Sequence, residues 1–447
     1  MSRKSTSRRA FLKAMGAGTA CAGLPGVSFA RRGGSEESGR EILDGASERI
    51  EKHRKGQAAL TLTGPDGRPL PAGTNVEVRQ TRHKFLFGCN IFKLGRCRTP
   101  EDNAAYAGRF ASLLNFATLP FYWWSYERQR GEPRDGRTEE IIRWCKVHGI
   151  TPKGHPLAWN WAEPPWLTGT PDEAMELQIK RIGRCVERFE GDINIWDVVN
   201  EATHYDRDRT TNQAPRLTEA ISRMGVGEYL RAAFRTARKA NPDATLLIND
   251  YRNDRPYAEK VIAELVDENG KAMYDVIGLQ SHMHSGYPGA ARWWDVCERY
   301  AKFEKPLHFT ETTFVSGPKN ESGWTTTPEG EQRQAEWAAE FYTLLFSHPA
   351  VEAITWWDFS DQGAWQQAPA GLLRDDMTPK PVYDRLHDLI KGQWWTTTTV
   401  EAGSNGRTDF DGFLGQYEAE AGVGGRRLFA RFTLNRSGPL DVQFSRP

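Results

Sequence analysis

Two glutamates stand directly after apolar runs that have the length and composition of buried strands. The run Ile193–Val199 is followed by Asn200 and Glu201, and the run Pro306–Thr310 is followed by Glu311. Two carboxyl groups at the carboxyl ends of barrel strands can share the work of retaining glycoside hydrolysis, one as proton donor and one as nucleophile. Glu201 and Glu311 are therefore the candidate catalytic pair.

The elements that must position this pair alternate regularly along the chain. Apolar runs predict eight buried strands, at residues 85–91, 113–119, 151–159, 193–199, 245–248, 276–280, 307–310 and 353–357. Helical periodicity lies between them, for example at residues 138–148, 172–189, 227–239, 257–268 and 329–346. This alternation predicts an α/β fold, a parallel (β/α)8 TIM barrel rather than an open doubly wound sheet. No glycine-rich phosphate loop follows the first strand, which argues against nucleotide binding.

Polar or aromatic groups follow six of the eight predicted strands. In a barrel the carboxyl ends of all strands meet on one face, so these groups belong to one candidate site. They are Gly154-His155 through Trp159, Asn200-Glu201, Asn249-Asp250-Tyr251, Gln280 through His284, Glu311, and Trp356 through Phe359. Amide and imidazole groups bind sugar hydroxyls, and indole rings stack on the apolar faces of pyranoses.

The two ends of the chain differ from the barrel. The segment Ser7-Arg8-Arg9-Ala10-Phe11-Leu12-Lys13, with small residues at Ser28-Phe29-Ala30, predicts a twin-arginine signal peptide over residues 1–30. We therefore expect export of the folded protein to the periplasm or the cell exterior. The predicted divisions that follow are a linker with one helix at 31–55, a small β segment at 56–82, the catalytic barrel at 83–395 and a β-rich segment at 396–447. The terminal β segments either brace the barrel or bind carbohydrate, and Phe413 and Tyr417 are the aromatic residues to test for binding.

Charge and cysteine content narrow the classes of partner. The 59 Lys and Arg residues balance 58 Asp and Glu residues, so no net field attracts nucleic acid or an anionic membrane. After Ala30 no apolar stretch is long enough to span a bilayer. Signal cleavage would leave five widely spaced cysteines, which form neither a disulfide framework nor a zinc motif, although a Cys89–Cys97 bridge stays open. We expect a monomer whose partner is a polysaccharide or oligosaccharide.

The strand-end motifs, taken together over about residues 83–390, resemble the family 10 glycoside hydrolases, which are mostly endo-β-1,4-xylanases. The matching segments, in the family's order, are Gly154-His155 with Trp159, Trp196-Asp197-Val198-Val199-Asn200-Glu201-Ala202, Gly225–Arg235, Ile248-Asn249-Asp250-Tyr251, Gly278-Leu279-Gln280-Ser281-His282, Thr310-Glu311, Trp357-Asp358-Phe359-Ser360-Asp361 with Trp365, Leu372-Leu373-Arg374-Asp375, and Lys380-Pro381-Val382-Tyr383. The resemblance implies a retaining barrel enzyme that needs no metal or cofactor.

The resemblance also implies a role for each candidate residue. Glu201 corresponds to the acid/base and Glu311 to the nucleophile, with His282 as the partner of the nucleophile. Asn200 corresponds to the group that binds the 2-hydroxyl of the reacting sugar. The other implied substrate-binding residues are His155, Trp159, Asn249, Gln280, Trp357 and Trp365. A proton donor needs a pKa raised by burial and by its carboxylate neighbour, whereas a nucleophile is kept ionised by hydrogen bonds.

One segment departs from the family. Where its members carry Thr-Pro-Glu-Asn and a following lysine, this chain has Thr118-Leu119-Pro120-Phe121-Tyr122-Trp123-Trp124, and Asn160 replaces a common histidine. The glycone subsites are thus rebuilt with aromatic residues, so the substrate is either xylan or a different or decorated β-glycan. Two further alternatives stay open. One is a metal-dependent hydrolase that uses His155, His282 and His284, and the other is a non-catalytic carbohydrate-binding barrel.

Overall fold

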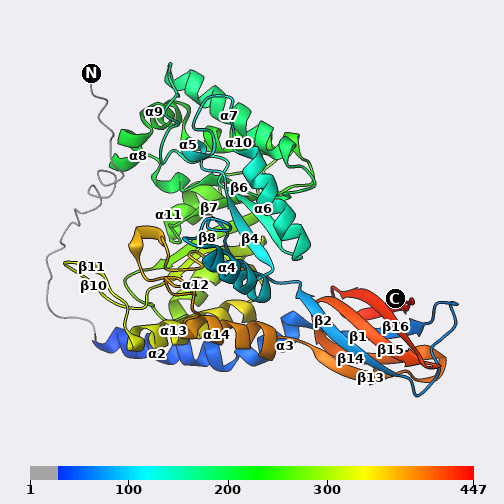
Figure 1. Ribbon diagram of the computed structural model, residues 1–447. Helices are drawn as coiled ribbons and strands as arrows, with labels where there is room; N and C mark the ends of the chain where they lie inside the picture. Colours follow the sequence, from blue (N-terminus) through cyan, green and yellow to red (C-terminus); the bar gives the residue numbers. More distant parts are fainter. Residues whose placement is uncertain (1–28) are drawn as a thin grey trace.

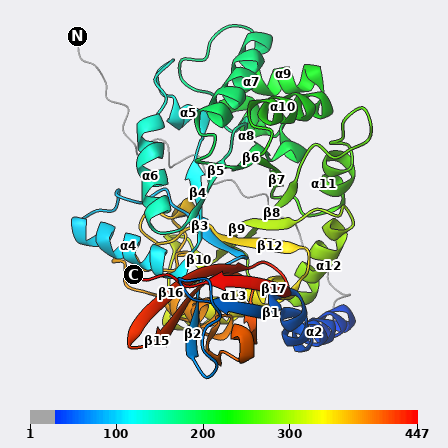
Figure 2. The same cartoon turned by 90° about the vertical axis from the view of Figure 1, so that its right-hand side faces the viewer.

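The computed structural model describes residues 29–447, so almost all of the predicted signal peptide lies outside the described part (Figure 1). Eight parallel strands form a closed barrel in the order β12-β3-β4-β5-β6-β7-β8-β9 (Figure 2). They are β3 (Leu86–Asn90), β4 (Phe116–Pro120), β5 (Thr151–His155), β6 (Ile195–Asn200), β7 (Thr245–Asp250), β8 (Val276–Met283), β9 (Leu307–Phe314) and β12 (Val351–Trp356). The prediction of a (β/α)8 barrel is confirmed.

Helices cover the outside of the barrel. The longer ones are α4 (Pro100–Leu113), α6 (Asp135–Val147), α7 (Pro171–Arg188), α9 (Pro215–Met224), α10 (Val226–Ala240), α12 (Ala290–Ala301) and α13 (Pro328–Ser347). Helix α7 shows why the sequence folds this way. Thr170 caps its first turn in a capping box with Glu173, Pro171 occupies the first helical position, and Ile182 and Val186 are buried against the barrel.

Several predicted boundaries were wrong, and the strand predicted at 151–159, for example, already ends at His155. The strand predicted at 113–119 begins only at Phe116, because Leu113 is the last residue of α4. The helix predicted at 257–268 is only α11 (Arg255–Tyr257) and one π turn, Ala258–Ile262. The Asp267 carboxylate instead accepts the backbone N–H groups of Asn269 and Lys271, and this local turn competes with helix formation.

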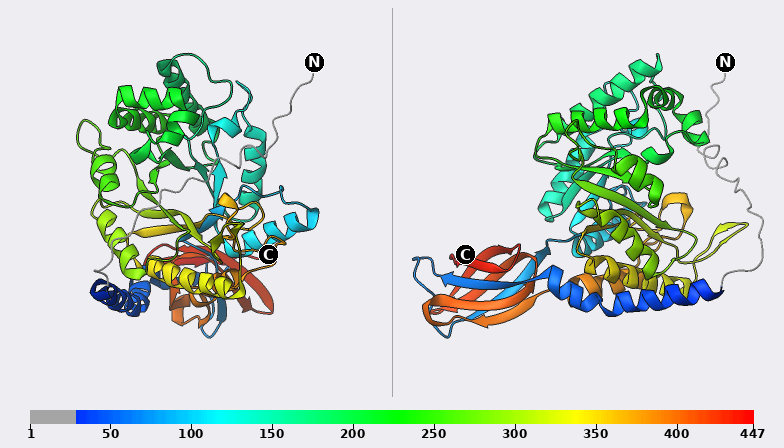
Figure 3. Two further views of the ribbon diagram at one scale, coloured as in Figure 1. Left: turned by 90° about the vertical axis from the view of Figure 1, so that its left-hand side faces the viewer. Right: turned by 180° about the vertical axis from the view of Figure 1, so that it is seen from behind.

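Strands from both ends of the chain form one β-sandwich beside the barrel (Figures 1 and 3). One sheet has the order β14-β1-β17 and the other β13-β2-β15-β16. The strands are β1 (Lys55–Thr63), β2 (Asn75–His83), β13 (Thr397–Glu401), β14 (Arg407–Phe413), β15 (Gly415–Val423), β16 (Arg426–Leu434) and β17 (Gly438–Gln443). Phe413 and Tyr417 are both buried, so neither ring is available to stack on a sugar.

Two helices, α2 (Phe29–Asp44) and α3 (Ala46–Arg54), occupy the region where the sequence predicted a linker and one helix. Figure 3 shows them along the outside of the barrel, where α2 packs on α12 and α3 packs on α13 next to the sandwich. The Arg54 guanidinium at the end of α3 donates to the carbonyl oxygens of Phe346, His348 and Val351 at 2.6–2.7 Å. The helices therefore fasten the sandwich to the end of α13 and the start of β12.

The described residues answer two further questions from the sequence. Cys89 and Cys97 are free thiols, and so are the other cysteines of the described part, so the open Cys89–Cys97 bridge is not formed. Between residues 29 and 447, no helix combines the length and apolar character that a membrane crossing requires.

Candidate active site

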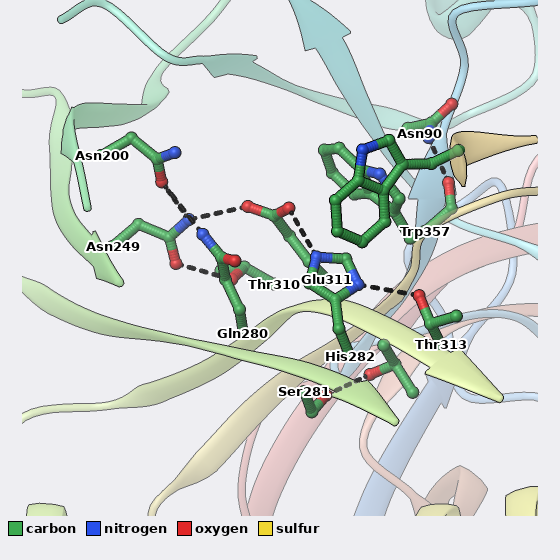
Figure 4. A network of polar contacts seen from close by, with 12 residues as sticks. Asn90, Asn200, Asn249, Gln280, Ser281, His282, Thr310, Glu311, Thr313 and Trp357 are labelled. Atoms are coloured by element: carbon green, nitrogen blue, oxygen red, sulfur yellow. Dashed lines mark hydrogen bonds and ion pairs between the residues drawn. The ribbon is translucent and has the colours of Figure 1, made fainter. Parts of the chain in front are cut away.

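Glu311 lies on β9 and points into the mouth of the barrel, where donors from neighbouring strands surround it (Figure 4). Its carboxylate accepts a hydrogen bond from Asn249 Nδ2 at 3.0 Å and contacts His282 Nε2 at 3.2 Å. The other ring nitrogen of His282 contacts the Thr313 hydroxyl at 2.8 Å, which fixes the orientation of the ring. His155 Nε2 lies 3.8 Å from Glu311 Oε1. Groups from strands β5, β7 and β8 therefore hold the carboxylate in place.

Glu201 follows β6 directly and has left-handed backbone angles, φ 57° and ψ 43°, which few non-glycine residues adopt. Its N–H donates to the Asn249 carbonyl oxygen at 2.8 Å, and its side chain is 10% exposed. Burial is the largest influence on the pKa of Glu201 and raises it, Arg207 opposes that rise, and Glu311 adds to it. Strained backbone of this kind is common at functional sites, where the surrounding fold holds it in place.

A chain of amide hydrogen bonds connects the two carboxyl groups. Gln280 Nε2 donates to Glu201 Oε1 and to Asn200 Oδ1, both at 3.3 Å. Asn249 Nδ2 donates to the same Asn200 oxygen at 2.8 Å and to Glu311 Oε1. Figure 4 shows these amides side by side at the strand ends. Asn249 is fully buried and reaches the cavity only through these partners, although the sequence placed it among the substrate-binding residues.

A second buried network lies beneath the carboxyl pair. Asp197 Oδ2 accepts from Lys153 Nζ and contacts His155 Nδ1, each at 2.7 Å, and all three side chains are at most 1% exposed. Burial alone would raise the pKa of Asp197, but Lys153 and His155 bring it below its ordinary value. The network orients His155 toward Glu311. Gly154 permits the arrangement, because a Cβ there would overlap the Trp196 ring.

The site is a cavity of about 590 Å³ at the carboxyl ends of the strands. It brings together nine of the ten residues that the sequence singled out: His155, Trp159, Asn200, Glu201, Gln280, His282, Glu311, Trp357 and Trp365. Trp365 is 37% exposed and its ring centre lies 4.6 Å from that of His282, so it forms part of the rim. Trp357 lies deeper, against His155 and His282.

The segment that departs from the family splits between the cavity and the core. Tyr122 and Trp124 line the cavity, and their rings lie 5.9 Å from that of Trp159. Phe121 packs instead on Trp196, and Trp123 is buried in a small apolar cluster with Leu167 and Leu217. Phe121 and Tyr122 lie between β4 and the short helix α5 (Trp123–Tyr126), which contains both tryptophans, so aromatic composition alone could not show which rings face the cavity.

The sequence reasoning missed several residues that line the cavity. These are Phe92, Lys93, Trp161, Arg207 and Asn253, whereas Tyr251 and Asp358 belong to strand-end groups that the sequence had already assigned to the site. Trp161 could have been found, because it lies two residues after Trp159 and their rings stack at 4.8 Å. Arg207 carries no sequence signal, yet it forms an ion pair with Glu201. Asn160, noted as unusual, is buried and holds the Arg207 loop rather than a sugar, since it donates to the Tyr205 carbonyl oxygen at 2.7 Å.

The metal-dependent alternative would need free imidazole nitrogens at the strand ends. Both ring nitrogens of His282 are engaged, by Glu311 and by Thr313. In the part of the chain from residue 29 onward, no group of three or more His, Cys, Asp or Glu side chains is arranged to hold a metal ion. The geometry around His282 is that of a partner to a carboxylate.

Comparison with known proteins identifies the class to which this fold and site belong. The family model described as "Glycosyl hydrolase family 10" matches residues 119–389, which is more than half of the chain. The chain belongs to glycosyl hydrolase family 10. The matched residues contain both glutamates and every barrel strand from β5 to β12.

The relatives in sequence are distant. The anti-sigma-I factor RsgI6 of Acetivibrio thermocellus is 25% identical over 419 residues, which cover 92% of this chain and 51% of the relative. The endo-1,4-beta-xylanase 5-like protein of Arabidopsis thaliana is 24% identical over 81% of this chain and 60% of its own length. Endo-1,4-beta-xylanase 3 of Hypocrea jecorina is 28% identical over 60% of this chain and 73% of its own length. The chain thus spans less than two thirds of the first two relatives.

Solved structures share the barrel. Native xylanase 10B from Thermotoga maritima has a TM-score of 0.58 and 23% identity, covering 69% of this chain and 96% of its own. Xylanase 10B from Thermotoga petrophila in complex with xylobiose has a TM-score of 0.57 and 24% identity, covering 69% and 95%. At these identities the likeness shows the fold.

Proposed function

We propose that this chain is a retaining glycoside hydrolase that cleaves β-1,4-linked xylan or a related plant cell-wall glycan. The observation that carries the proposal is one aromatic-walled cavity that holds two buried carboxyl groups in different surroundings. Burial raises the pKa of Glu201, whereas Asn249 and His282 surround Glu311 with hydrogen-bonding groups. Two carboxyl groups separated in this way take the roles of acid and nucleophile.

In the first step, a Glu311 oxygen attacks the anomeric carbon and forms a covalent glycosyl ester. The bond from that carbon to the glycosidic oxygen breaks at the same time, and Glu201 gives its proton to the departing oxygen. The sugar in this step becomes oxocarbenium-like, so hydrogen bonds from Asn200 and Gln280 to its hydroxyls would strengthen as charge develops. Tyr122, Trp159 and Trp357 enclose the ring and exclude water.

In the second step, Glu201 is ionised and accepts a proton from a water molecule. The hydroxide that results attacks the anomeric carbon, the ester bond to Glu311 breaks, and the carboxylate is regenerated. Two displacements on the same carbon leave the anomeric configuration unchanged. No metal or redox group takes part in either step.

The substrate class rests on the family and on the aromatic cavity. Among the relatives, several are named endo-1,4-beta-xylanases, and one solved neighbour holds xylobiose. Tyr122 and Trp124 replace the polar residues that the family uses to bind the glycone, so fewer hydroxyl contacts are available on that side. This difference favours a related or decorated glycan alongside plain xylan.

The test is a hydrolysis screen over xylan, arabinoxylan, glucuronoxylan, β-glucan and aryl glycosides, with the anomer of the first product followed by NMR. We expect β-linked substrates to be cleaved and the β-anomer to appear first. Initial release of the α-anomer would contradict the retaining mechanism. Stoichiometric zinc, with activity lost to a chelator, would instead support a metal-dependent hydrolase.

We also propose that the protein is a monomer exported through the twin-arginine pathway. The residues that support export are Arg8 and Arg9 with the small residues around Ala30. Replacing both arginines with lysine should leave the protein in the cytoplasm of the producing cell, as measured by cell fractionation. Light scattering of the exported protein would test the monomer.

A further inference from the structure

Arg207 reaches the acid/base candidate from a loop outside the barrel. It lies just before α8 (Asp208–Gln213) and lines the cavity. Its Nη2 donates to Glu201 Oε2, and the guanidinium lies 5.2 Å from the Trp161 ring centre and 5.4 Å from that of Tyr251. An arginine between two aromatic rings, in contact with a catalytic carboxyl group, is placed to meet the substrate.

The loop that carries Arg207 is held in place by side-chain hydrogen bonds. The Thr210 hydroxyl contacts the carbonyl oxygens of Tyr205 and Arg207 at 2.6 and 2.8 Å. Asn160 Nδ2 binds the same Tyr205 carbonyl oxygen at 2.7 Å. At the start of the loop, the Thr203 N–H donates to Asp250 at 2.9 Å. Because these hydrogen bonds fix the backbone of the loop, they hold the Arg207 guanidinium at the cavity and limit its exposure to solvent.

The guanidinium has unused hydrogen-bonding capacity. Of its nitrogen atoms, only Nη2 has a hydrogen-bond acceptor within residues 29–447, and Nε is buried without a partner. Arginine presents five N–H donors in a planar fork that matches two oxygens of one carboxylate. The remaining donors on the two Nη atoms of Arg207, whose side chain is 27% exposed, can therefore bind a further anion at the cavity wall.

The ion pair between Arg207 and Glu201 conflicts with the proton transfer that the first chemical step requires. A guanidinium beside a carboxyl group favours the ionised form, whereas Glu201 must carry a proton when the glycosidic bond breaks. A second carboxylate that competes for the guanidinium would remove this conflict. Glu201 could then take up a proton while the substrate is bound.

We propose that Arg207 binds a carboxylate of the substrate, and that the preferred glycan carries a uronic acid next to the scissile bond on the leaving-group side. This inference rests on the proposed glycoside hydrolase function and names its substrate class. The position follows from the two oxygens of Glu201. Oε1 belongs to the amide chain that leads to Glu311 and the attacked sugar, whereas Oε2 faces Arg207. The neighbour Arg209 stacks on Trp161 at 3.8 Å and adds positive charge to the same side.

The experiment compares three β-1,4-xylo-oligosaccharides of equal length. One is unbranched, one carries a single glucuronic acid branch, and one carries that branch reduced to glucose, which keeps the shape and removes the charge. For the full chain we expect kcat/KM on the acidic substrate to exceed that on its reduced analogue at least tenfold. A hydrogen bond to a charged group corresponds to roughly tenfold to hundredfold in binding.

The variant Arg207→Met should abolish this ratio, and Arg207→Lys should keep only part of it because lysine lacks the planar fork. Arg209→Met is the matched control, since it removes an arginine from the same Trp161 ring without a hydrogen bond to Glu201, and it should retain most of the ratio. Calorimetric titration of the reduced and acidic oligosaccharides into Glu311→Gln, with and without Arg207→Met, gives the same comparison without turnover. Circular dichroism confirms that each variant folds.

Two outcomes would overturn this inference without overturning the proposed function. One is equal kcat/KM on the acidic and reduced substrates in the wild type, and the other is an acid preference that survives in Arg207→Met. In both cases hydrolysis still occurs, so the proposed function stands. If the wild type cleaves none of these substrates or the β-glycans of the wider screen, the proposed function fails and this inference fails with it.

Discussion

The groups around Glu311 come from barrel strands, whereas those around Glu201 include one from a loop, Arg207. Asn249, His282 and His155, which approach Glu311, all lie on strands β5, β7 and β8. Glu201 lies beyond the end of β6, and its ion-pair partner Arg207 comes from the segment that precedes α8. Strand register is set by the whole sheet, but a loop can change without disturbing the fold. In the proposed mechanism, barrel strands thus hold the attacking carboxylate, while the proton donor also contacts a residue from a loop.

Removing the strand-borne carboxylate should have the largest effect on activity. Glu311→Ala eliminates the nucleophile, so kcat should fall by about ten-thousandfold or more while glycan binding is retained. Added azide should restore turnover and yield the α-glycosyl azide, detected by NMR. Glu352→Ala, an exposed glutamate on the barrel strand β12, is the control and should keep full activity. Full activity in Glu311→Ala would contradict the assignment of the nucleophile.

Removing the acid/base should have a large effect that depends on the leaving group. In Glu201→Ala, kcat/KM on an oligosaccharide should fall by about a hundredfold to ten-thousandfold, because the departing oxygen needs a proton. On a dinitrophenyl glycoside, whose leaving group needs no proton, the first step should change far less. A comparison of burst and steady-state rates on the two substrates measures the difference. Equal losses on both would show that Glu201 is not the proton donor.

The stability of the barrel around Glu311 should also depend on the buried charge network of Lys153, Asp197 and His155. Asp197→Asn leaves Lys153 as an unpaired buried cation, which should lower the free energy of unfolding by about 3–5 kcal/mol. Because the pKa of Asp197 is lowered in the folded state, its contribution is present above pH about 4 and is lost as the pH falls through that lowered pKa. Thermal unfolding between pH 2 and 7 measures both effects.

The pair Lys146–Asp192 supplies the matched control for this network. It joins the same two residue types at the surface, where the side chains are 59% and 35% exposed. Asp192→Asn should therefore change the free energy of unfolding by about 1 kcal/mol or less. Equal losses of unfolding free energy in Asp197→Asn and Asp192→Asn would show that the buried network contributes no more to stability than a surface ion pair.

The smallest expected effect is a shift in the pH profile. The charged groups next to Glu201 are Arg207, Glu311 and Asp250, and only Arg207 among them opposes its raised pKa. Activity should fall as the pH rises through the pKa of Glu201, because the donor loses its proton. In Arg207→Met the alkaline limb of kcat/KM on a neutral aryl glycoside should move up by about one pH unit. A limb that stays or moves down would contradict the role of the ion pair.

The fold and the strand-borne part of the site could be predicted because both are local in sequence. Each apolar run marked a strand, and parallel barrel strands bring their carboxyl ends together whatever the loops do. The sequence alone therefore predicts that four site residues lie near one another, namely Asn200, Gln280, His282 and Glu311. The boundary at Phe116 and the lost helix after Tyr257 were missed, because helix ends and side-chain turns depend on single hydrogen bonds.

The remainder depended on contacts between distant segments. The alternation of Phe121 and Tyr122 between core and cavity followed from how β4 leaves the barrel. The joining of β2 with β13 and β15 in one sheet pairs residues more than 300 positions apart, so no local pattern could reveal it. The same holds for Arg49 and Arg54, which bind the end of α13.

The amino-acid sequence by itself determined the barrel and the two glutamates, because residue periodicity and strand-end chemistry act over a few positions. Only the tertiary structure decided which hydrogen-bonding and charged groups surround each carboxyl group. The amide chain from Glu201 to Glu311, the buried Lys153–Asp197–His155 network and the Arg207 ion pair all join side chains from different elements. Coulomb interactions and desolvation depend on distance and burial in three dimensions, so the chemical difference between two identical residue types arises only on folding.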